Sequence, residues 1–218
     1  MIHYKYYLLV ISCVTLLLAC NRNGDKPDVS EQLFLDYKKL VTEVESDTAL
    51  TESDLGKSWE TRNDSLRKSF YHYKSEVTAH LDNFEAERRE EVNAFDDRLE
   101  VAFEARDKKY DNVSYRYKLR RELLHMEVAE DDMSRIDTAN IVTTYEHFVS
   151  TLKSNLSNYT ASDWLLIEGW WIALNNRKKA VSSMLQPADL ERIVKQEQIY
   201  LKLREKALNE SRISVTTT

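Results

Sequence analysis

The chain has 218 residues, a formal net charge of −6 at pH 7 and a hydrophobic content of 42%. This acidic balance opposes nucleic acids and anionic membrane surfaces as general partners, because both require a basic protein face. The only cysteines are Cys13 and Cys20. The rest of the chain therefore holds no thiol for a disulfide, a catalytic nucleophile or a cysteine-based metal site.

An apolar segment of 14 residues, 6–19, follows the single charged residue of the N-terminus, Lys5. A helix that crosses a bilayer needs about 20 residues, so this segment is short for an uncleaved anchor, which remains the alternative. A basic start, an apolar run and a small residue, here Ala19, are the parts of a secretory signal. Because Cys20 follows Ala19, the segment resembles the signal of bacterial lipoproteins. The resemblance implies that residues 1–19 are cleaved off and that Cys20 is acylated.

Residues 20–29 are polar and include Gly24 and Pro27, a composition typical of a flexible tether. Asn21 stands directly after the cysteine. It is not the aspartate that marks inner-membrane retention in enteric-type lipoproteins. The resemblance therefore implies an exported protein on the outer membrane rather than the inner one, facing the periplasm or the cell surface.

Few residues interrupt the chain after the tether: only Gly56, Gly169 and Pro187. Strands with tight turns would need far more glycine and proline. We therefore expect residues 30–218 to form one all-α domain, an antiparallel bundle of about five helices. The first helix is expected from Ser30 to about residue 47.

A very long amphipathic helix is expected next, unbroken from Ser53 to about His125 and about 100 Å long. Thr51 and Asp54 have the spacing of a capping box at its start. Apolar residues recur in steps of 4, 3 and 4, an 11-residue period typical of a nearly straight helix. The positions on this stripe are Val77, Leu81, Phe84, Arg88, Val92, Phe95, Leu99, Phe103, Arg106 and Tyr110. Residues 112–114 are the expected place for a kink.

Three shorter helices are expected to begin near Ser134, at Ser162 and at Pro187. The helix after Ser162 is apolar on nearly all sides, with Trp164, Trp170 and Trp171 in its first half. Such a helix is either central in its bundle or has a second apolar partner. Central burial is the simpler interpretation, and a surface for a partner helix, an apolar ligand or a membrane is the alternative.

Two groups of histidines and glutamates have the spacing of metal ligands. His72, Glu76 and His80 follow one another in steps of four, but four-residue steps drift around a helix and a fourth ligand is missing. We therefore expect no metal there and no other cofactor.

The second group, Glu122 with His125, matches half of a di-iron carboxylate motif. A di-iron site needs a second Glu-x-x-His pair and two further glutamates, and His147 has Thr144 in place of the glutamate. This ligand count excludes a di-iron site.

Three tripeptides resemble the Asp-Ser/Thr-apolar acceptor for O-glycosylation in exported proteins of the Bacteroides group. They contain Thr48, Ser65 and Thr138. The resemblance implies a lineage and an exported location. Thr48 is the best candidate because it lies in an expected loop, whereas Ser65 lies in an expected helix.

No motif for a hydrolase, a nucleotide or a dinucleotide is present, so we expect no enzymatic activity. The expected function is a lipid-anchored scaffold or interaction protein of the cell envelope, with the membrane and a protein as its partners. An envelope chaperone or carrier that uses the tryptophan-rich helix and a metal-binding sensor are the alternatives, and a hydrolase with an unrecognised site is the most remote.

Replacing Cys20→Ala is expected to abolish the incorporation of labelled palmitate, because the acyl chains would be attached at this residue. The protein should then be released from the membrane or remain unprocessed. Metabolic labelling and membrane fractionation measure both effects. Labelling of the variant at the wild-type level would contradict a lipoprotein signal.

Overall fold

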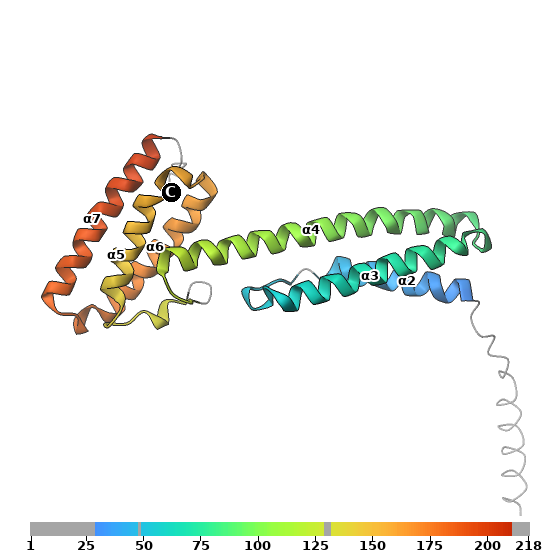
Figure 1. The fold of residues 1–218 in the computed structure, drawn as a ribbon, viewed down its shortest axis with the longest axis horizontal. Helices are drawn as coiled ribbons and strands as arrows, with labels where there is room; N and C mark the ends of the chain where they lie inside the picture. Colours follow the sequence, from blue (N-terminus) through green and yellow to red (C-terminus); the bar gives the residue numbers. More distant parts are fainter. Residues whose placement is uncertain (1–28, 48, 129–131, 211–218) are drawn as a thin grey trace, which may run out of the picture. The chain divides into compact units, whose positions relative to one another are not determined.

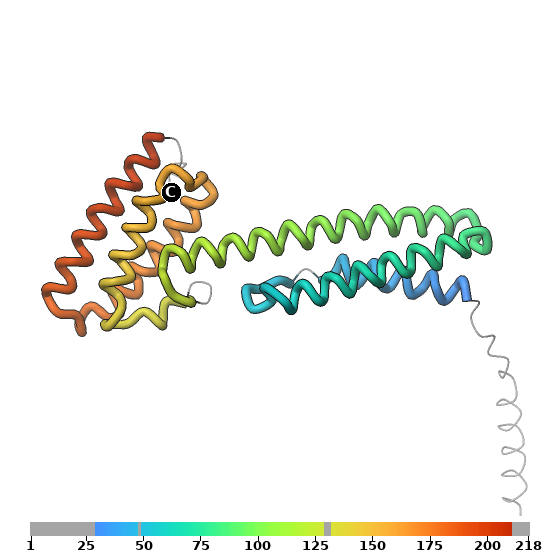
Figure 2. The backbone as a smooth tube through the Cα atoms, viewed as in Figure 1, coloured from blue at the N-terminus to red at the C-terminus, as the bar shows by residue number. Residues whose placement is uncertain are grey.

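A computed structural model describes residues 29–47, 49–128 and 132–210. These residues form α-helices joined by short 3-10 turns, without a strand among them, so the predicted all-α fold is confirmed (Figures 1 and 2). Six helices are described: α2 (Val29–Ser46), α3 (Lys57–Ala79), α4 (Ala86–Leu124), α5 (Ile141–Ser154), α6 (Ala161–Val181) and α7 (Pro187–Asn209). None of them is both long enough and apolar enough to cross a membrane.

The described chain packs as two compact units, each with its own core. The described part of unit 1 comprises residues 29–47 and 62–103. Unit 2 comprises residues 49–61 and the described residues from 104 onward. Helices α3 and α4 each contribute one part to both units. A continuous apolar stripe on a helix predicts that the helix is packed, but not that successive parts of the stripe belong to different cores.

The core of unit 1 is formed by α2, the C-terminal part of α3 and the N-terminal part of α4. Its buried side chains are Phe34, Tyr37, Leu40, Val41, Val44, Phe70, Val77, Phe84, Val92, Phe95, Leu99 and Phe103. Tyr37 is completely buried among them, and its hydroxyl donates a hydrogen bond to the carboxylate of Asp96. Lys74 pairs with the same carboxylate at 3.0 Å. Burial, together with Asp96, raises the pKa of Tyr37, so its hydroxyl remains a donor.

The predicted unbroken helix from Ser53 to His125 is wrong. Helix α3 ends at Ala79, a 3-10 turn covers Leu81–Asn83, and α4 begins at Ala86. Figure 2 shows the backbone reversing at this turn, so that α3 and α4 run side by side within unit 1. The 4-3-4 spacing of apolar residues continues through the turn to Phe84. Phe84 is itself buried beside α2, with its ring centroid 6.1 Å from that of Phe34. The periodicity therefore contains no sign of the break.

Helix α4 is 39 residues long and runs without interruption through residues 112–114, where a kink was expected. The predicted stripe is buried along it at Val92, Phe95, Leu99, Phe103 and Arg106. Arg106 is 5% exposed. Its guanidinium lies 4.7 Å from the centre of the Trp59 ring instead of reaching water. A cation over an aromatic face explains how an arginine can occupy an apolar stripe.

The core of unit 2 is built from the C-terminal part of α4 and from α5, α6 and α7. Trp171 of α6 is stacked on Tyr200 of α7 at 3.9 Å and meets Tyr145 of α5 edge-on at 5.3 Å. Ion pairs between Lys178 and Glu197 and between Arg204 and Glu168 join α6 to α7. The tryptophan-rich helix is therefore central in its bundle.

Helix starts differ from the predictions where several cap residues compete. Thr160 and Asp163 form a complete capping box at the start of α6, so the cap is not Ser162. Thr51 and Asp54 also form the predicted box, but it opens a 3-10 turn and α3 begins later, at Lys57. Only the tertiary contacts of the first turn decide between neighbouring Ser, Thr and Asp residues.

Replacing Trp171→Ala or Trp170→Ala is expected to lower the free energy of unfolding by about 3–5 kcal/mol, the usual cost of a large deletion in a core. Both side chains are buried, at 8% and 1% exposure. The adjacent Ile172 is 60% exposed. Ile172→Ala is the matched control and should change stability by less than about 0.5 kcal/mol. Denaturant unfolding followed by circular dichroism measures all three, and equal losses would contradict this placement.

Candidate functional site

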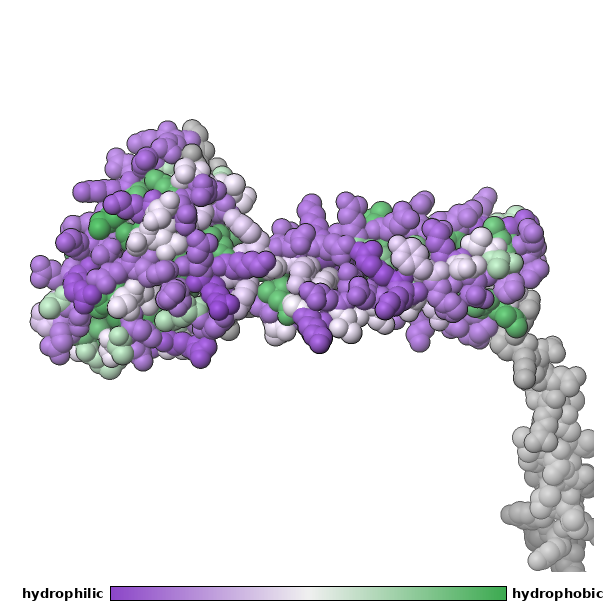
Figure 3. Space-filling model, in the orientation of Figure 1, coloured by the Kyte–Doolittle hydropathy of each residue, from purple (hydrophilic) through white to green (hydrophobic). Residues whose placement is uncertain are grey.

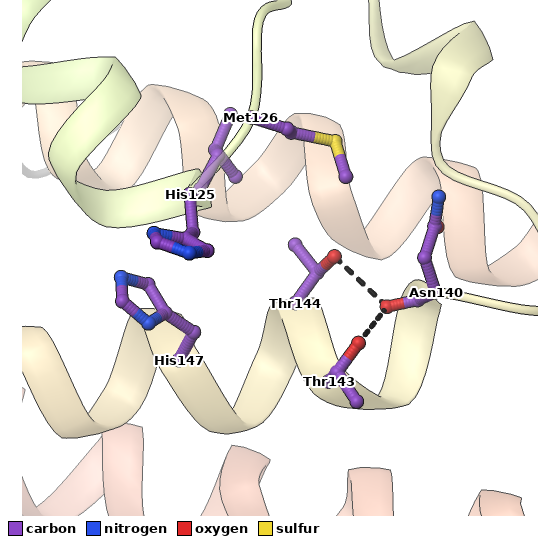
Figure 4. Close-up of a pocket in the computed structure, with 7 residues that line it drawn as sticks. His125, Met126, Asn140, Thr143, Thr144 and His147 are labelled. Atoms are coloured by element: carbon purple, nitrogen blue, oxygen red, sulfur yellow. Dashed lines mark hydrogen bonds between the residues drawn. The ribbon is translucent and has the colours of Figure 1, made fainter.

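Two histidines meet where the C-terminus of α4 lies against α5. His125 directly follows the last residue of α4, and His147 lies in the middle of α5. Their rings face each other with centroids 4.5 Å apart and planes inclined by 33° (Figure 4). His125 is exposed and His147 is half-buried. The pair is therefore accessible from solvent.

The backbone of His125 is left-handed, with φ of 55°. It is the only non-glycine residue of the described chain with positive φ. Glycine usually occupies the position after a helix end, because a Cβ atom costs about 1–2 kcal/mol in this conformation. An imidazole at this position is an outlier of the kind that is concentrated at functional sites.

The orientation of His147 is defined by hydrogen bonds to α4 and to its own helix. Its Nε2 lies 2.9 Å from the carbonyl oxygen of Glu122 and 3.1 Å from Oγ1 of Thr151. The carbonyl of Glu122 is one of the last four of α4, which have no partner within the helix. Because a carbonyl only accepts hydrogen bonds, Nε2 must carry the hydrogen. In the neutral ring, Nδ1 then has a free lone pair.

A pocket of about 240 Å³ opens beside the two rings. It is lined by Leu124, His125, Met126, Asn140, Thr143, Thr144 and His147. Both threonine hydroxyls donate to the backbone carbonyl of Asn140, at 2.8 and 2.9 Å (Figure 4). The side chains left to act on a ligand are two imidazoles and one thioether. This set can coordinate a metal ion or exchange protons, but it pairs no nucleophile with a base.

The carboxylates near the pocket are engaged elsewhere. Glu122 accepts a hydrogen bond from Asn155 at 2.9 Å. Glu127 accepts one from Tyr117 at 2.6 Å and pairs with Arg121 at 3.1 Å. The pocket itself is lined by no carboxylate. A carboxylate-bridged di-iron centre, excluded above by ligand count, therefore lacks its bridging groups here as well.

The three tryptophans considered as a partner surface lie in the core of unit 2. Trp164, Trp170 and Trp171 are 0%, 1% and 8% exposed. In this conformation they present no open surface to a ligand or membrane. The large apolar side chains that α6 does expose are Leu165 and Ile172.

The other predicted positions are distributed along the chain. His72 is exposed on α3, whereas His80 lies beyond the end of that helix. Within the described ranges, no three His, Cys, Asp or Glu residues are placed to hold a metal ion. The His72, Glu76 and His80 series is therefore not gathered into a site.

The predicted processing and modification residues fall partly outside the described residues. Ala19, Cys20 and Thr48 lie there. Ser65 is exposed within α3. Thr138 is exposed in the turn before α5, where Asp137 accepts a hydrogen bond from the backbone N–H of Ala139 at 2.8 Å.

No protein-family model, no curated protein and no solved structure matches this chain. Functional conclusions therefore depend on the residues themselves. In the sequence, His125 and His147 stand out only as fragments of a di-iron motif. Their pairing is not visible there because one follows the end of α4 and the other lies in α5, 22 positions apart in the sequence. The available signal was a histidine at the position where a helix would normally end in glycine.

Replacing His125→Gly is expected to keep the free energy of unfolding or raise it by up to about 1 kcal/mol, because glycine adopts positive φ without strain. His125→Val removes the same imidazole but should be clearly destabilising, since β-branched residues avoid this conformation. Chemical denaturation compares the two variants. If glycine lowered stability as much as valine does, the imidazole contact rather than the backbone would dominate at this position.

Proposed function

We propose that this protein is a lipid-anchored, non-catalytic interaction protein of the bacterial cell envelope. Acyl chains on Cys20 hold it at the membrane, preferably the outer membrane, and unit 2 binds a protein partner. The signal-like N-terminus supports the anchor. The absence of a paired nucleophile and base in the pocket beside His125 supports a binding role over a hydrolytic one.

The observation that carries the partner proposal is the regular exposure of apolar side chains on α6 and α7. Leu165 and Ile172 are 63% and 60% exposed, and Val194 and Leu201 are 46% and 60% exposed. Each pair is seven residues apart, two helical turns, so its members lie on one side of their helix. Two neighbouring helices thus each present an apolar pair to solvent.

The four side chains, which we call the apolar surface of unit 2, are set among charged residues. Glu168 and Arg204 form an ion pair between α6 and α7, and Lys195 and Lys202 are exposed beside Val194 and Leu201. Figure 3 shows hydrophobic residues set among hydrophilic ones over unit 2. Apolar contacts with a charged rim are typical of protein interfaces. Two-turn spacing on both helices fits an amphipathic helix of another envelope protein as the occupant.

The carrier alternative depended on an exposed tryptophan face, and the indole rings lie in the core instead. The large hydrophobic side chains that α6 exposes, Leu165 and Ile172, are not aromatic, so α6 gives the carrier alternative no support. Thr138 is the preferred O-glycosylation candidate among the described residues, because its turn is exposed whereas Ser65 is within a helix.

Photo-crosslinking residues placed separately at Leu165 and Leu201 of the full-length, membrane-attached protein are expected to give the same crosslinked partner. Ser150, exposed on α5, is the matched control position and should give none. Ile172→Lys should reduce crosslinking from Leu201 several-fold while leaving the helical content unchanged. Equal adducts from Ser150, or no effect of Ile172→Lys, would refute this surface.

A further inference from the structure

We propose that the pocket between the end of α4 and α5 binds one copper ion as Cu(I), through the imidazoles of His125 and His147 and the thioether of Met126. This site is separate from the apolar surface of unit 2 and does not depend on the partner proposal. It involves binding alone, without a redox step.

His147 is oriented in the way that metal-bound histidines usually are. Such a histidine donates its second ring N–H to a carbonyl or carboxylate, which selects the tautomer and holds the ring in place. Nε2 of His147 donates to the carbonyl oxygen of Glu122, with Oγ1 of Thr151 also within 3.1 Å. Its Nδ1 forms no hydrogen bond within the described structure, so a lone pair is available to an ion.

His125 supplies the second nitrogen donor. Neither of its ring nitrogens is hydrogen-bonded to another described residue, and its ring lies 4.5 Å from that of His147. The left-handed backbone of this residue directly follows the end of α4. The two rings face each other, so the exposed His125 side chain would have to rotate to direct one of its nitrogens to an ion held at Nδ1 of His147.

Met126 provides a soft third donor. It is half-buried and lines the same pocket, and Figure 4 shows its sulfur above Thr144, on the side away from the two imidazole rings. Its unbranched side chain has three rotatable bonds, so the sulfur can adjust its position at little cost. Thioether ligands select Cu(I), and imidazole also suits copper.

The donor set of the pocket favours Cu(I) over Zn²⁺. Structural and catalytic zinc sites usually include thiolate or carboxylate ligands or three imidazoles, and this pocket has none of these sets. The neighbouring hollow, which His125 and Met126 also line, contains Lys118 and Arg121 but also Glu122 and Glu127, so its charged side chains balance. The choice of ion therefore depends on the donors, and a neutral set that includes a soft thioether suits Cu(I) better than Zn²⁺.

Cu(I) competition against a coloured Cu(I) chelator tests the site in the detergent-solubilised, full-length protein under anaerobic, reducing conditions. We expect one equivalent of Cu(I) to transfer to the wild type. Any cysteine thiols are common to all proteins compared, so they cannot produce a difference between variants. X-ray absorption of the copper should report nitrogen and sulfur neighbours.

Four variants separate this site from other ligands. His125→Gly, His147→Ala and Met126→Leu should each weaken Cu(I) binding by at least about tenfold, a loss typical for metal-site residues. Met126→Leu conserves volume, and circular dichroism checks that every variant is folded. His80→Ala is the matched control, because that histidine lies in a different unit, and it should bind like the wild type.

Three results would overturn the proposal. One is a wild type that takes no Cu(I) from the chelator. Another is an equal loss in His80→Ala. The third is Zn²⁺ binding at least as tight as Cu(I) binding and lost in the same variants, which would reject the assignment of copper.

Discussion

Helix α4 is the element on which both cores depend, because it supplies buried side chains to each of them. Its first half supplies Val92, Phe95 and Leu99 to unit 1, and its last turns supply Leu119 and Leu123 to unit 2. An isolated helix gains little stability from its own hydrogen bonds, so each half of α4 is stabilised by the helices that cover it. The charged residues on the other faces of this 39-residue helix keep those faces in water.

Buried polar contacts hold the less regular parts of the chain. Arg120 of α4 is only 1% exposed, and its guanidinium binds Glu52 through two hydrogen bonds, one of 2.7 Å. This pair attaches the turn before α3 to α4, and removing one partner would leave a buried charge uncompensated. Arg177 of α6 likewise donates to the backbone carbonyl of Ile136, which attaches the segment before α5. Long-range arginine contacts thus position segments that have little helical structure.

The histidine pair lies where the end of α4 contacts α5. The last carbonyls of a helix need partners from outside it, and His147 of α5 provides one for Glu122. The contact that satisfies α4 also leaves Nδ1 of His147 with a lone pair beside a solvent-accessible imidazole. A copper site would in this way arise from a helix junction, whereas the apolar surface of unit 2 arises from the outer faces of α6 and α7. The two features use different residues, so binding of a metal and of a partner can be separated experimentally.

The sequence by itself determined the helical class, the residues that face a core and the start of α7 at Pro187, because helix periodicity and proline geometry are local properties. Burial of Val92, Phe95, Leu99 and Phe103 agrees with that periodicity. Only the tertiary structure decided the reversal at Leu81–Asn83 and the division into two units, because an apolar stripe does not specify its partner. The meeting of His125 with His147 was decided in the same way, since α5 must fold back onto the end of α4 before two distant imidazoles can face each other.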